Sequence, residues 1–263
     1  MPGKTVFDFA GAHVLVTGAN GGIGRAIARL FAEAGADLTL TAHRGHQFLD
    51  ELATIYGPAR VTQEALDLSS PASIGTLVAA MVGRAPLDVV VHCAGVSRPA
   101  PLEALSSEAW REVMETNVRG VLLLTQGLLT NLNPGASVVA VASMAGHEPY
   151  AGMGVYSASK AALIMLIRQM AVEFAPLGIR VNAVSPGLIR TDLTAQVYAD
   201  ARLEKQRRSL VPAGRIGEPE DVAGVVAFLA SEAAAYLTGQ SILVDGGLLG
   251  TIQGHLMGRP ASH

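Results

Sequence analysis

Several features are scarce in this sequence, and each absence argues against a class of protein. Cys93 is the only cysteine among 263 residues, which excludes an internal disulfide and fits the reducing cytoplasm. No segment has the 18 or more uninterrupted apolar residues of a membrane span, and the first residues lack a signal-peptide core. The net charge of only -3 argues against a nucleic-acid partner. We therefore expect a cytoplasmic protein with no membrane or nucleic-acid partner.

Metal ligands in a known arrangement are also missing. The chain has 7 histidines, but no two have the spacing of an HExxH pair, and there is no second cysteine to complete a thiolate site. We expect no metal centre. What the sequence does have is 50% hydrophobic residues, enough for a substantial core in one domain that spans residues 1–263.

Apolar strands and helical patterns alternate along the chain. Short, continuously apolar runs predict strands near 13–17, 37–42, 60–66, 88–92, 137–142, 179–184 and 241–245. Helical patterns lie between them near 22–34, 46–56, 71–83, 106–130, 156–175 and 219–230. Such alternation is typical of a parallel sheet with helices on both faces. The sequence thus predicts a single-domain α/β fold with a doubly wound, seven-stranded parallel sheet.

A glycine-dense turn joins the first strand to the first helix, in HVLVTGANGGIGRAIA. Glycine lets the backbone come close to a ligand, and the free N–H groups at a helix N-terminus suit a pyrophosphate. We therefore expect Gly18, Gly22 and Gly24 to form a phosphate cradle. The turn indicates a nucleotide-binding site because it lies between a strand and a helix.

Ser143, Tyr156 and Lys160 form a second pattern, in VASMAGHEPYAGMGVYSASKAAL. Positions i and i+4 share one face of a helix, so the Tyr156 phenol and the Lys160 ammonium should meet. A phenol titrates near pH ~10, and a nearby positive charge makes it a usable acid or base because that charge stabilises the phenolate. Ser143 ends the apolar run SVVAVAS, which places its hydroxyl at the carboxyl end of a strand. Two hydroxyl groups that converge on one oxygen suit a carbonyl or alcohol substrate.

These motifs resemble those of the short-chain dehydrogenase/reductase family. TGANGGIG matches the family's TGxxxGxG turn, and YSASK matches its YxxxK pair. METNVRG, SPGLIRT and the stretch from GRIGEPEDVAGVVAFLAS to LTGQSILVDGG match further family segments in the same order, so the similarity covers roughly residues 10–247. The resemblance implies a Rossmann-type fold and reversible hydride transfer between a nicotinamide and a carbonyl carbon. It is about equally strong toward 3-oxoacyl-carrier-protein reductases and toward sugar or polyol dehydrogenases.

The resemblance also implies a role for each residue of the catalytic site. Tyr156 is expected to act as the general acid in reduction and as the base in oxidation. Lys160 would favour the phenolate and hydrogen-bond the nicotinamide ribose, and Ser143 would hold the substrate oxygen. Asn117, in METNVRG, would hold a water molecule that links Lys160 to bulk solvent. The alternative for Asn117 is an exposed position on a helix.

Most of the expected cofactor contacts follow from the same resemblance. After the fourth strand the chain has His92, Cys93, Ala94 and Gly95 where the family usually has NNAG, which keeps the close backbone approach but loses two Asn side chains. We expect Cys93 to be a small buried thiol without a redox role. The residues expected at the cofactor are Gly18, Asn20, Gly21, Gly22, Ile23, Gly24, His43, Arg44, Asp67, Leu68, Ala94, Gly95, Tyr156, Lys160, Pro186, Gly187, Ile189 and Thr191.

The end of the second strand bears on the choice between NADP and NAD. An NAD-binding chain has Asp or Glu there, about 20 residues after the glycine turn, to bind the ribose 2′-hydroxyl. This chain has Ala42, followed by His43 and Arg44, so no carboxylate repels a 2′-phosphate and Arg44 can bind it. We favour NADP(H). NAD(H) is the alternative, because Gly21 stands where NADP-preferring relatives often carry a basic residue.

The sequence defines the substrate less closely. We expect residues 188–214 to form a lid, with a solvated charged helix as the alternative for DARLEKQRR. We place LLTNLNPGAS and VEFAPLG near the entrance, and their lack of Lys and Arg favours a free small ketone or alcohol over an acidic carrier protein. The lid cations that would favour the opposite are Arg202, Lys205, Arg207 and Arg208. The expected substrate contacts are Ser143, Met144, Tyr150 and Leu188.

Two other functions and one assembly question stay open. A non-redox, lyase-like enzyme on this scaffold would be expected to lose Lys160, and a catalytically silent NADP-binding sensor would be expected to lose some catalytic residue. Lys160 and the other expected catalytic residues are all present in this chain. The helix around residues 161–174 is apolar on more than one face, which favours a homotetramer or homodimer. Burial of that helix within its own subunit is the alternative.

Overall fold

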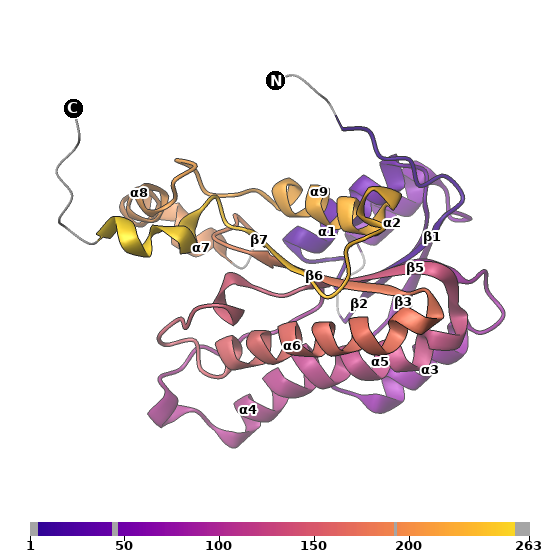
Figure 1. Ribbon diagram of the computed structural model, residues 1–263, viewed down its shortest axis with the longest axis horizontal. Helices are drawn as coiled ribbons and strands as arrows, with labels where there is room; N and C mark the ends of the chain where they lie inside the picture. The colour runs from indigo at the N-terminus through magenta and orange to yellow at the C-terminus, as the bar shows by residue number, and fades with distance from the viewer. Residues whose placement is uncertain (1–4, 44–46, 192–193, 256–263) are drawn as a thin grey trace.

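The computed structural model describes residues 5–43, 47–191 and 194–255. Seven parallel strands form one sheet in the order β3-β2-β1-β4-β5-β6-β7. Figure 1 shows this sheet with helices on both faces, which confirms the predicted doubly wound α/β fold of the Rossmann type. In chain order the strands are β1 (His13–Thr17), β2 (Asp37–Ala42), β3 (Val61–Ala65), β4 (Leu87–His92), β5 (Leu132–Val141), β6 (Arg180–Pro186) and β7 (Ser241–Val244).

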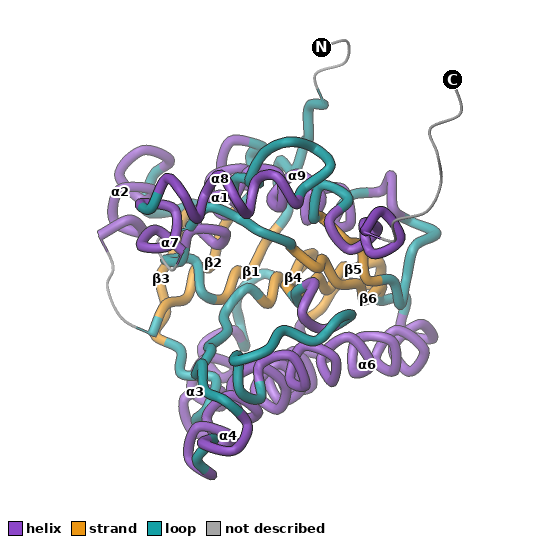
Figure 2. The backbone as a smooth tube through the Cα atoms, turned by 90° about the vertical axis from the view of Figure 1, so that its left-hand side faces the viewer, coloured by secondary structure: helices purple, strands orange, loops and turns teal. Residues whose placement is uncertain are grey.

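Each face of the sheet is covered by its own set of helices (Figure 2). The helices on one face are α1 (Gly22–Glu33), α2 (Gln47–Tyr56) and α9 (Pro219–Ala230). Those on the other face are α3 (Pro71–Met81), α5 (Gly120–Leu128) and α6 (Tyr156–Phe174). Three shorter helices complete the set, namely α4 (Ser107–Met114) before α5, and α7 (Ala195–Ala199) and α8 (Ala201–Leu210) between β6 and α9.

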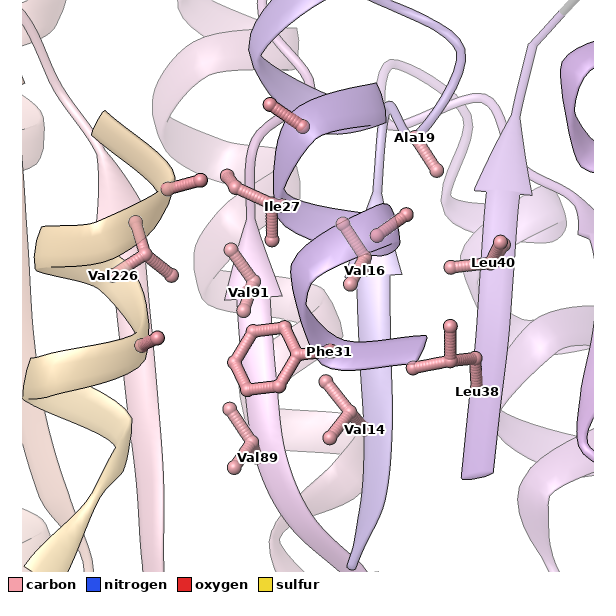
Figure 3. Packing of buried hydrophobic residues seen from close by; sticks show 14 of the residues in the cluster. Val14, Val16, Ala19, Ile27, Phe31, Leu38, Leu40, Val89, Val91 and Val226 are labelled. Atoms are coloured by element: carbon pink, nitrogen blue, oxygen red, sulfur yellow. The ribbon is translucent and has the colours of Figure 1, made fainter. Parts of the chain in front are cut away.

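The alternation of side chains along the strands divides the core in two. Val14 and Val16 of β1 belong to the cluster under α1, α2 and α9, whereas Leu15 between them belongs to the cluster under α3, α5 and α6. In Figure 3, Phe31 of α1 packs beside Val14 and Val89 in the first of these clusters. Successive residues of a strand point to opposite faces. A strand that is buried on both faces is therefore mainly apolar.

The strand order reverses between β1 and β4. The chain runs from β1 to β2 and β3 on one side, then crosses to β4, β5, β6 and β7 on the other. The loops after β1 and β4 therefore separate, and in open parallel sheets ligands bind in the crevice between such loops. The glycine turn, Ser143 and Gly187 all follow strands that end at this edge.

The structure corrects one predicted element. The stretch 106–130, predicted as continuously helical, forms α4, a π-helical turn over Glu115–Arg119 and then α5. The turn carries Asn117, which is 1% exposed, so the alternative of an exposed helix position is wrong. A π turn adds a residue to the helical repeat and changes the direction of the side chains around it. Apolar periodicity does not reveal such a turn, because the helices before and after it keep their own spacing.

Two segments lie at the edge opposite to the one we expect from the sequence. LLTNLNPGAS leads into β5, and VEFAPLG spans the end of α6 just before β6. Ser143 follows the other end of β5, so both segments lie at the amino ends of the strands, where the Gly135 N–H donates a 3.1 Å hydrogen bond to the Gly178 carbonyl. Their lack of Lys and Arg therefore says nothing about the substrate.

Helix α6 is buried along one side. Leu163, Ile167 and Met170 are buried, whereas Met165 and Val172 are 59% and 76% exposed. The second apolar face is thus not covered by the described residues of its own chain, and the homotetramer or homodimer stays a prediction. No helix within the described ranges is both long and apolar enough to cross a bilayer.

Candidate active site

The structure brings Ser143, Tyr156, Lys160 and Asn117 to the carboxyl edge of the sheet. Ser143 lies just beyond β5, Tyr156 is the first residue of α6, and Lys160 follows one turn later. Asn117 comes from the π-helical turn, which contacts α6. Three segments that are distant in the sequence therefore meet at one place.

Lys160 lies over the ring of Tyr156. Its Nζ is 5.7 Å from the ring centroid and donates a 2.8 Å hydrogen bond to the Val141 carbonyl at the end of β5. Lys160 is only 4% exposed, while Tyr156 stays partly exposed. The Lys160 ammonium group is thus buried beside the phenol ring, with a backbone carbonyl as hydrogen-bond acceptor.

Asn117 is held by both polar atoms of its side chain. Its Oδ1 accepts from the Val96 N–H at 2.8 Å, and its Nδ2 donates to the Val96 carbonyl at 2.9 Å and to the Ser159 hydroxyl at 3.1 Å. Ser159 in turn donates to the Tyr156 carbonyl at 2.7 Å. Asn117 thus ties the loop after β4 to the first turn of α6. The sequence analysis missed Ser159, although its place in YSASK next to Lys160 was an available signal.

Ser143 begins a short 3-10 turn that also contains Met144. The Ser143 hydroxyl oxygen accepts a 3.1 Å hydrogen bond from the Ala145 N–H and caps this turn. A hydroxyl that accepts this bond can still donate its own hydrogen to a substrate oxygen. The turn packs tightly on α6, since a Cβ on Gly146 would lie 2.8 Å from the Lys160 carbonyl oxygen. The Ser143 loop and α6 are therefore held together.

The glycine turn is too crowded to carry side chains. Gly18 has a φ of +66°, and a Cβ there would lie 2.7 Å from the Ala94 Cα. A Cβ on Gly24 would lie 2.2 Å from the Gly18 carbonyl oxygen. Gly21 precedes α1 and has no side chain to cap it, which leaves the N-terminus of that helix accessible to a ligand. This crowded backbone fits the pyrophosphate of a dinucleotide.

The segment after β6 meets the glycine turn. A Cβ on Gly22 would lie 3.0 Å from the Thr191 Cβ, so the two segments touch. Pro186 ends β6, and a Cβ on Gly187 would lie 2.6 Å from the Asp245 Cβ, which leaves room only for glycine. The other predicted residues that lie within these two segments are Asn20, Ile23, Leu188 and Ile189.

Asp67 and Leu68 follow β3 at the same edge. Ser69 donates two hydrogen bonds to Oδ1 of Asp67, from its hydroxyl at 2.7 Å and from its N–H at 2.9 Å, and these lower the pKa of the carboxyl. His43, exposed at the end of β2, lowers that pKa further through its charge. Arg44, the other cofactor residue predicted in this region, lies outside the described residues.

His92 and Cys93 occupy the positions where the family usually has Asn. His92 is 1% exposed, its Nε2 lies 2.8 Å from the Thr125 Oγ1, and burial lowers its pKa to about 4. Cys93 keeps some exposed surface, but its desolvated surroundings raise the pKa of the thiol to about 12, so the thiol stays protonated and unreactive. The N–H groups of Cys93 and Ala94 both donate to the Thr17 Oγ1, at 3.1 and 3.2 Å. Thr17 therefore holds the backbone at Cys93 and Ala94.

Tyr150 lies in the loop between Ser143 and Tyr156. Its N–H donates a 3.2 Å hydrogen bond to the Ser157 Oγ, and its ring is 45% exposed. The Tyr150 hydroxyl lies 3.4 Å from Nη2 of Arg207 on α8. In the segment predicted as a lid, α8 thus reaches the loop between Ser143 and Tyr156.

A polar cluster behind the Ser143 loop was missed by the sequence analysis. The Nε2 of His147 is 3.0 Å from the Ser185 Oγ and 3.2 Å from the Ser241 Oγ, and the two hydroxyl oxygens are 2.8 Å apart. The cluster fastens the loop after Ser143 to β6 and β7. No motif spacing could have revealed it, because its members come from three distant segments.

Comparison with known proteins agrees with this geometry. Residues 18–249 match a family model described as "Enoyl-(Acyl carrier protein) reductase". The 3-oxoacyl-[acyl-carrier-protein] reductase FabG of Vibrio cholerae is 37% identical over 246 residues, which cover 92% of this chain and 98% of the relative. A short-chain dehydrogenase/reductase of Brucella melitensis, described as a glucose/ribitol dehydrogenase, has a TM-score of 0.86 at 36% identity, with 93% of this chain and 99% of that one covered. The chain belongs to the short-chain dehydrogenase/reductase family.

A further solved member of the family carries a nicotinamide cofactor. The gluconate 5-dehydrogenase of Burkholderia cenocepacia, in complex with NADP and tartrate, has a TM-score of 0.85 at 28% identity, with 94% of this chain and 98% of that one covered. Membership of the short-chain dehydrogenase/reductase family makes this chain an oxidoreductase that binds NAD(P) on a Rossmann fold and acts on small molecules.

Proposed function

We propose that this chain transfers a hydride reversibly between NADP(H) and the carbonyl or secondary alcohol carbon of a small molecule, with Tyr156 as acid and base. The observation that carries the proposal is the meeting of the four polar residues beside the cofactor loop. A Cβ on Gly95 would lie 3.2 Å from the Asn117 Oδ1 and 3.4 Å from the Lys160 Nζ. The glycine turn, whose Gly18 packs on Ala94, and the proton-transfer residues thus lie beside the same loop.

Each side chain has one task in this mechanism. In reduction, Tyr156 donates its phenol proton to the carbonyl oxygen, and Lys160 over its ring stabilises the phenolate that remains. Ser143 donates a hydrogen bond to the same oxygen and holds it in place. The nicotinamide, when bound, supplies the hydride in reduction and accepts it in oxidation. Asn117 acts as a positioning residue through Ser159, and the water relay expected at Asn117 stays a prediction.

NADP(H) is the cofactor we favour. Ala42 ends β2 where an NAD-binding chain has a carboxylate, and the exposed His43 follows it. Arg44, next in the sequence, would bind the 2′-phosphate. The pyrophosphate would lie on the turn 18–24 at the N-terminus of α1. The adenine would lie near Asp67, and the other proposed contacts are Leu68, Ala94, Gly95, Lys160, Pro186, Gly187, Ile189 and Thr191.

A 3-oxoacyl-carrier-protein reductase is the second candidate. The V. cholerae relative bears this name. A specific observation also favours it, because α8 carries the four cations Arg202, Lys205, Arg207 and Arg208, which suit an acidic carrier protein. A catalytically silent sensor has less support, since every residue expected for catalysis is present and these residues meet. The cytoplasmic location stays a prediction from the sequence.

A panel of ketones mixed with NADPH and the purified protein tests the proposal. The panel contains aliphatic ketones, keto sugars, keto acids and a 3-oxoacyl thioester, and the expected result is oxidation of NADPH by at least one class. Tight binding of NADPH without oxidation by any ketone would reject the proposal in favour of the sensor. A thioester reduced much faster on a carrier protein than on a small thiol would favour the second candidate.

A further inference from the structure

The helices of the predicted lid lie at the same end of the sheet as the catalytic loop. Figure 1 shows α7 and α8 at the end where the loop before α6 also lies. Arg207 of α8 joins the two sides, because its Nη2 is 3.4 Å from the hydroxyl of Tyr150. Tyr150 is in turn held at the start of α6 by the bond from its N–H to Ser157, next to Tyr156. The Arg207 guanidinium therefore lies beside the loop that leads into the proposed catalytic helix.

The ring of Tyr198 supports the Arg207 side chain. The guanidinium carbon of Arg207 is 5.9 Å from the ring centroid of Tyr198 on α7, and that of Arg190 is 5.2 Å from the same centroid. Tyr198 is only 5% exposed, so the ring is a fixed support, and its buried hydroxyl has no partner among the described residues. Stacking on an aromatic ring restrains an arginine while leaving most of its N–H donors free.

Arg207 has no carboxylate partner in the described part of the chain, in contrast to Arg190 and Arg215. Arg190 forms ion pairs with Glu204 at 2.9 Å and Glu218 at 3.4 Å, and Arg215 pairs with Asp221. Glu204 is the only acidic residue within α8, and Arg190 already engages it. A guanidinium that is fixed, partly buried and unpaired beside this loop is available to an anionic ligand.

We propose that Arg207, with the Tyr150 hydroxyl beside it, binds a carboxylate of the substrate, so that the physiological substrate is a keto acid or the corresponding hydroxy acid. This inference rests on the proposed function, since it concerns the same site. One guanidinium balances the single charge of a carboxylate and matches its two oxygens, whereas a phosphate carries nearly two charges and usually requires more donors. The unpaired charge also attracts anionic substrates to the site.

Matched pairs of substrates test the inference. Acetoacetate and levulinate are each compared with their methyl esters, which keep the ketone and remove the charge. The measured quantity is the ratio of kcat/KM for the acid to kcat/KM for its ester, with NADPH as reductant. We expect the native enzyme to prefer an acid. In Arg207→Met, which keeps the apolar stem but loses the charge, the ratio should fall about 10- to 100-fold, the usual loss for a charge-assisted hydrogen bond.

Arg208→Met is the control variant. It removes the same charge from the next position of the same helix, and Arg208 is exposed with no side-chain hydrogen bond or ion pair to another described residue. We expect the ratio in this variant to stay within about twofold of the native value, since an exposed charge is screened. An equal fall of the ratio in both variants would overturn the inference. It would indicate a long-range electrostatic effect of all the α8 cations, or a macromolecular partner that binds the whole helix.

A binding measurement separates this inference from the proposed function. Calorimetry with acetoacetate or levulinate and the NADP⁺ complex should show weaker binding in Arg207→Met than in Arg208→Met or the native protein. Loss of NADPH oxidation with every ketone, with this difference in binding intact, would reject the proposed function alone. Equal rates for acids and esters in the native enzyme, or no binding of either acid, would overturn the role of Arg207.

Discussion

His92 is a buried titratable side chain at the end of β4, next to the proposed cofactor crevice. Its Nε2 meets Thr125, whose own hydroxyl donates to the Val121 carbonyl at 2.8 Å, so Thr125 can accept the His92 Nε2–H. The other ring nitrogen, Nδ1, is buried and has no partner among the described residues. A proton on Nδ1 would therefore be both desolvated and unbonded, which explains why the pKa is lowered from 6.5 to about 4.

This histidine should make the fold sensitive to acid. Above pH 6.5 both folded and unfolded His92 are neutral, and between pH 6.5 and pH 4 only the unfolded chain takes up the proton, so stability is lost as the pH falls. We expect the free energy of unfolding to drop about 2 kcal/mol more between pH 7 and pH 5 in the native protein than in His92→Asn. Urea titrations at the two pH values measure this difference. Parallel pH dependence in the two proteins would show that His92 is not the cause.

The sequence predicts those residues whose spacing has a chemical meaning. Tyr156 and Lys160 can be paired from the sequence because four residues make one helical turn, and Ser143 can be placed at a strand end by its apolar run. Ser159 and Arg207 could not be assigned their contacts, because these depend on where the π-helical turn and α8 come to lie. Arg207 is one of four similar cations in the sequence, and only the folded chain distinguishes it by its contacts with Tyr150 and Tyr198.

At the scale of single elements, the turn between β1 and α1 is the most constrained. In Gly24→Ala the new Cβ would meet the Gly18 carbonyl oxygen at 2.2 Å, so the turn must open. We expect overpacking of this kind to cost about 1–3 kcal/mol, which lowers the Tm by several degrees, at roughly 2–4 °C per kcal/mol. Differential scanning calorimetry of the apo-protein measures the change.

Gly21→Ala is the matched control for this turn. Its Cβ would lie 3.5 Å from the same carbonyl oxygen, an ordinary contact, and the backbone at Gly21 has a φ of -80° that alanine adopts freely. Its Tm should fall much less than that of Gly24→Ala. If the two variants lose the same stability, the close approach of α1 to Gly18 is not what makes glycine necessary at position 24.

The wrong predictions about single elements have physical reasons. Apolar periodicity follows α4 and α5 but does not register the extra residue of the π turn 115–119, in which Asn117 hydrogen-bonds Val96 and Ser159. The segments 128–137 and 172–178, which we expected near the entrance, lie at the other edge because each leads into the amino end of a strand. In a parallel sheet every loop that precedes a strand lies at the edge away from the site.

At the scale of the whole molecule, the cofactor should bridge the two halves of the sheet. The proposed contacts come from the ends of β1, β2 and β3 on one side of the switch point and of β4, β5 and β6 on the other. A ligand that binds only the folded state at 100 times its Kd adds about 2.7 kcal/mol. That corresponds to a rise in Tm of roughly 5–10 °C for a chain of this size.

The rise in Tm that each cofactor causes also measures the cofactor preference. We expect NADPH to raise the Tm more than NADH at equal concentration, because His43 and Arg44 can bind the 2′-phosphate. In Arg44→Ala the advantage of NADPH should disappear while the shift with NADH stays. Thermal shifts with both cofactors measure this, and equal losses for NADPH and NADH would mean that the NADP assignment is wrong.

The kinetics of Tyr156→Phe test the central claim most directly, since this change removes the phenol oxygen and little volume. We expect kcat for the best ketone to fall about 10²- to 10⁴-fold, because Ser143 only hydrogen-bonds the substrate oxygen and the proposed proton donor is lost. The Kd for NADPH, measured by fluorescence on the same preparation, should stay within about twofold. Turnover equal to that of the native enzyme, with NADPH still bound, would contradict the account.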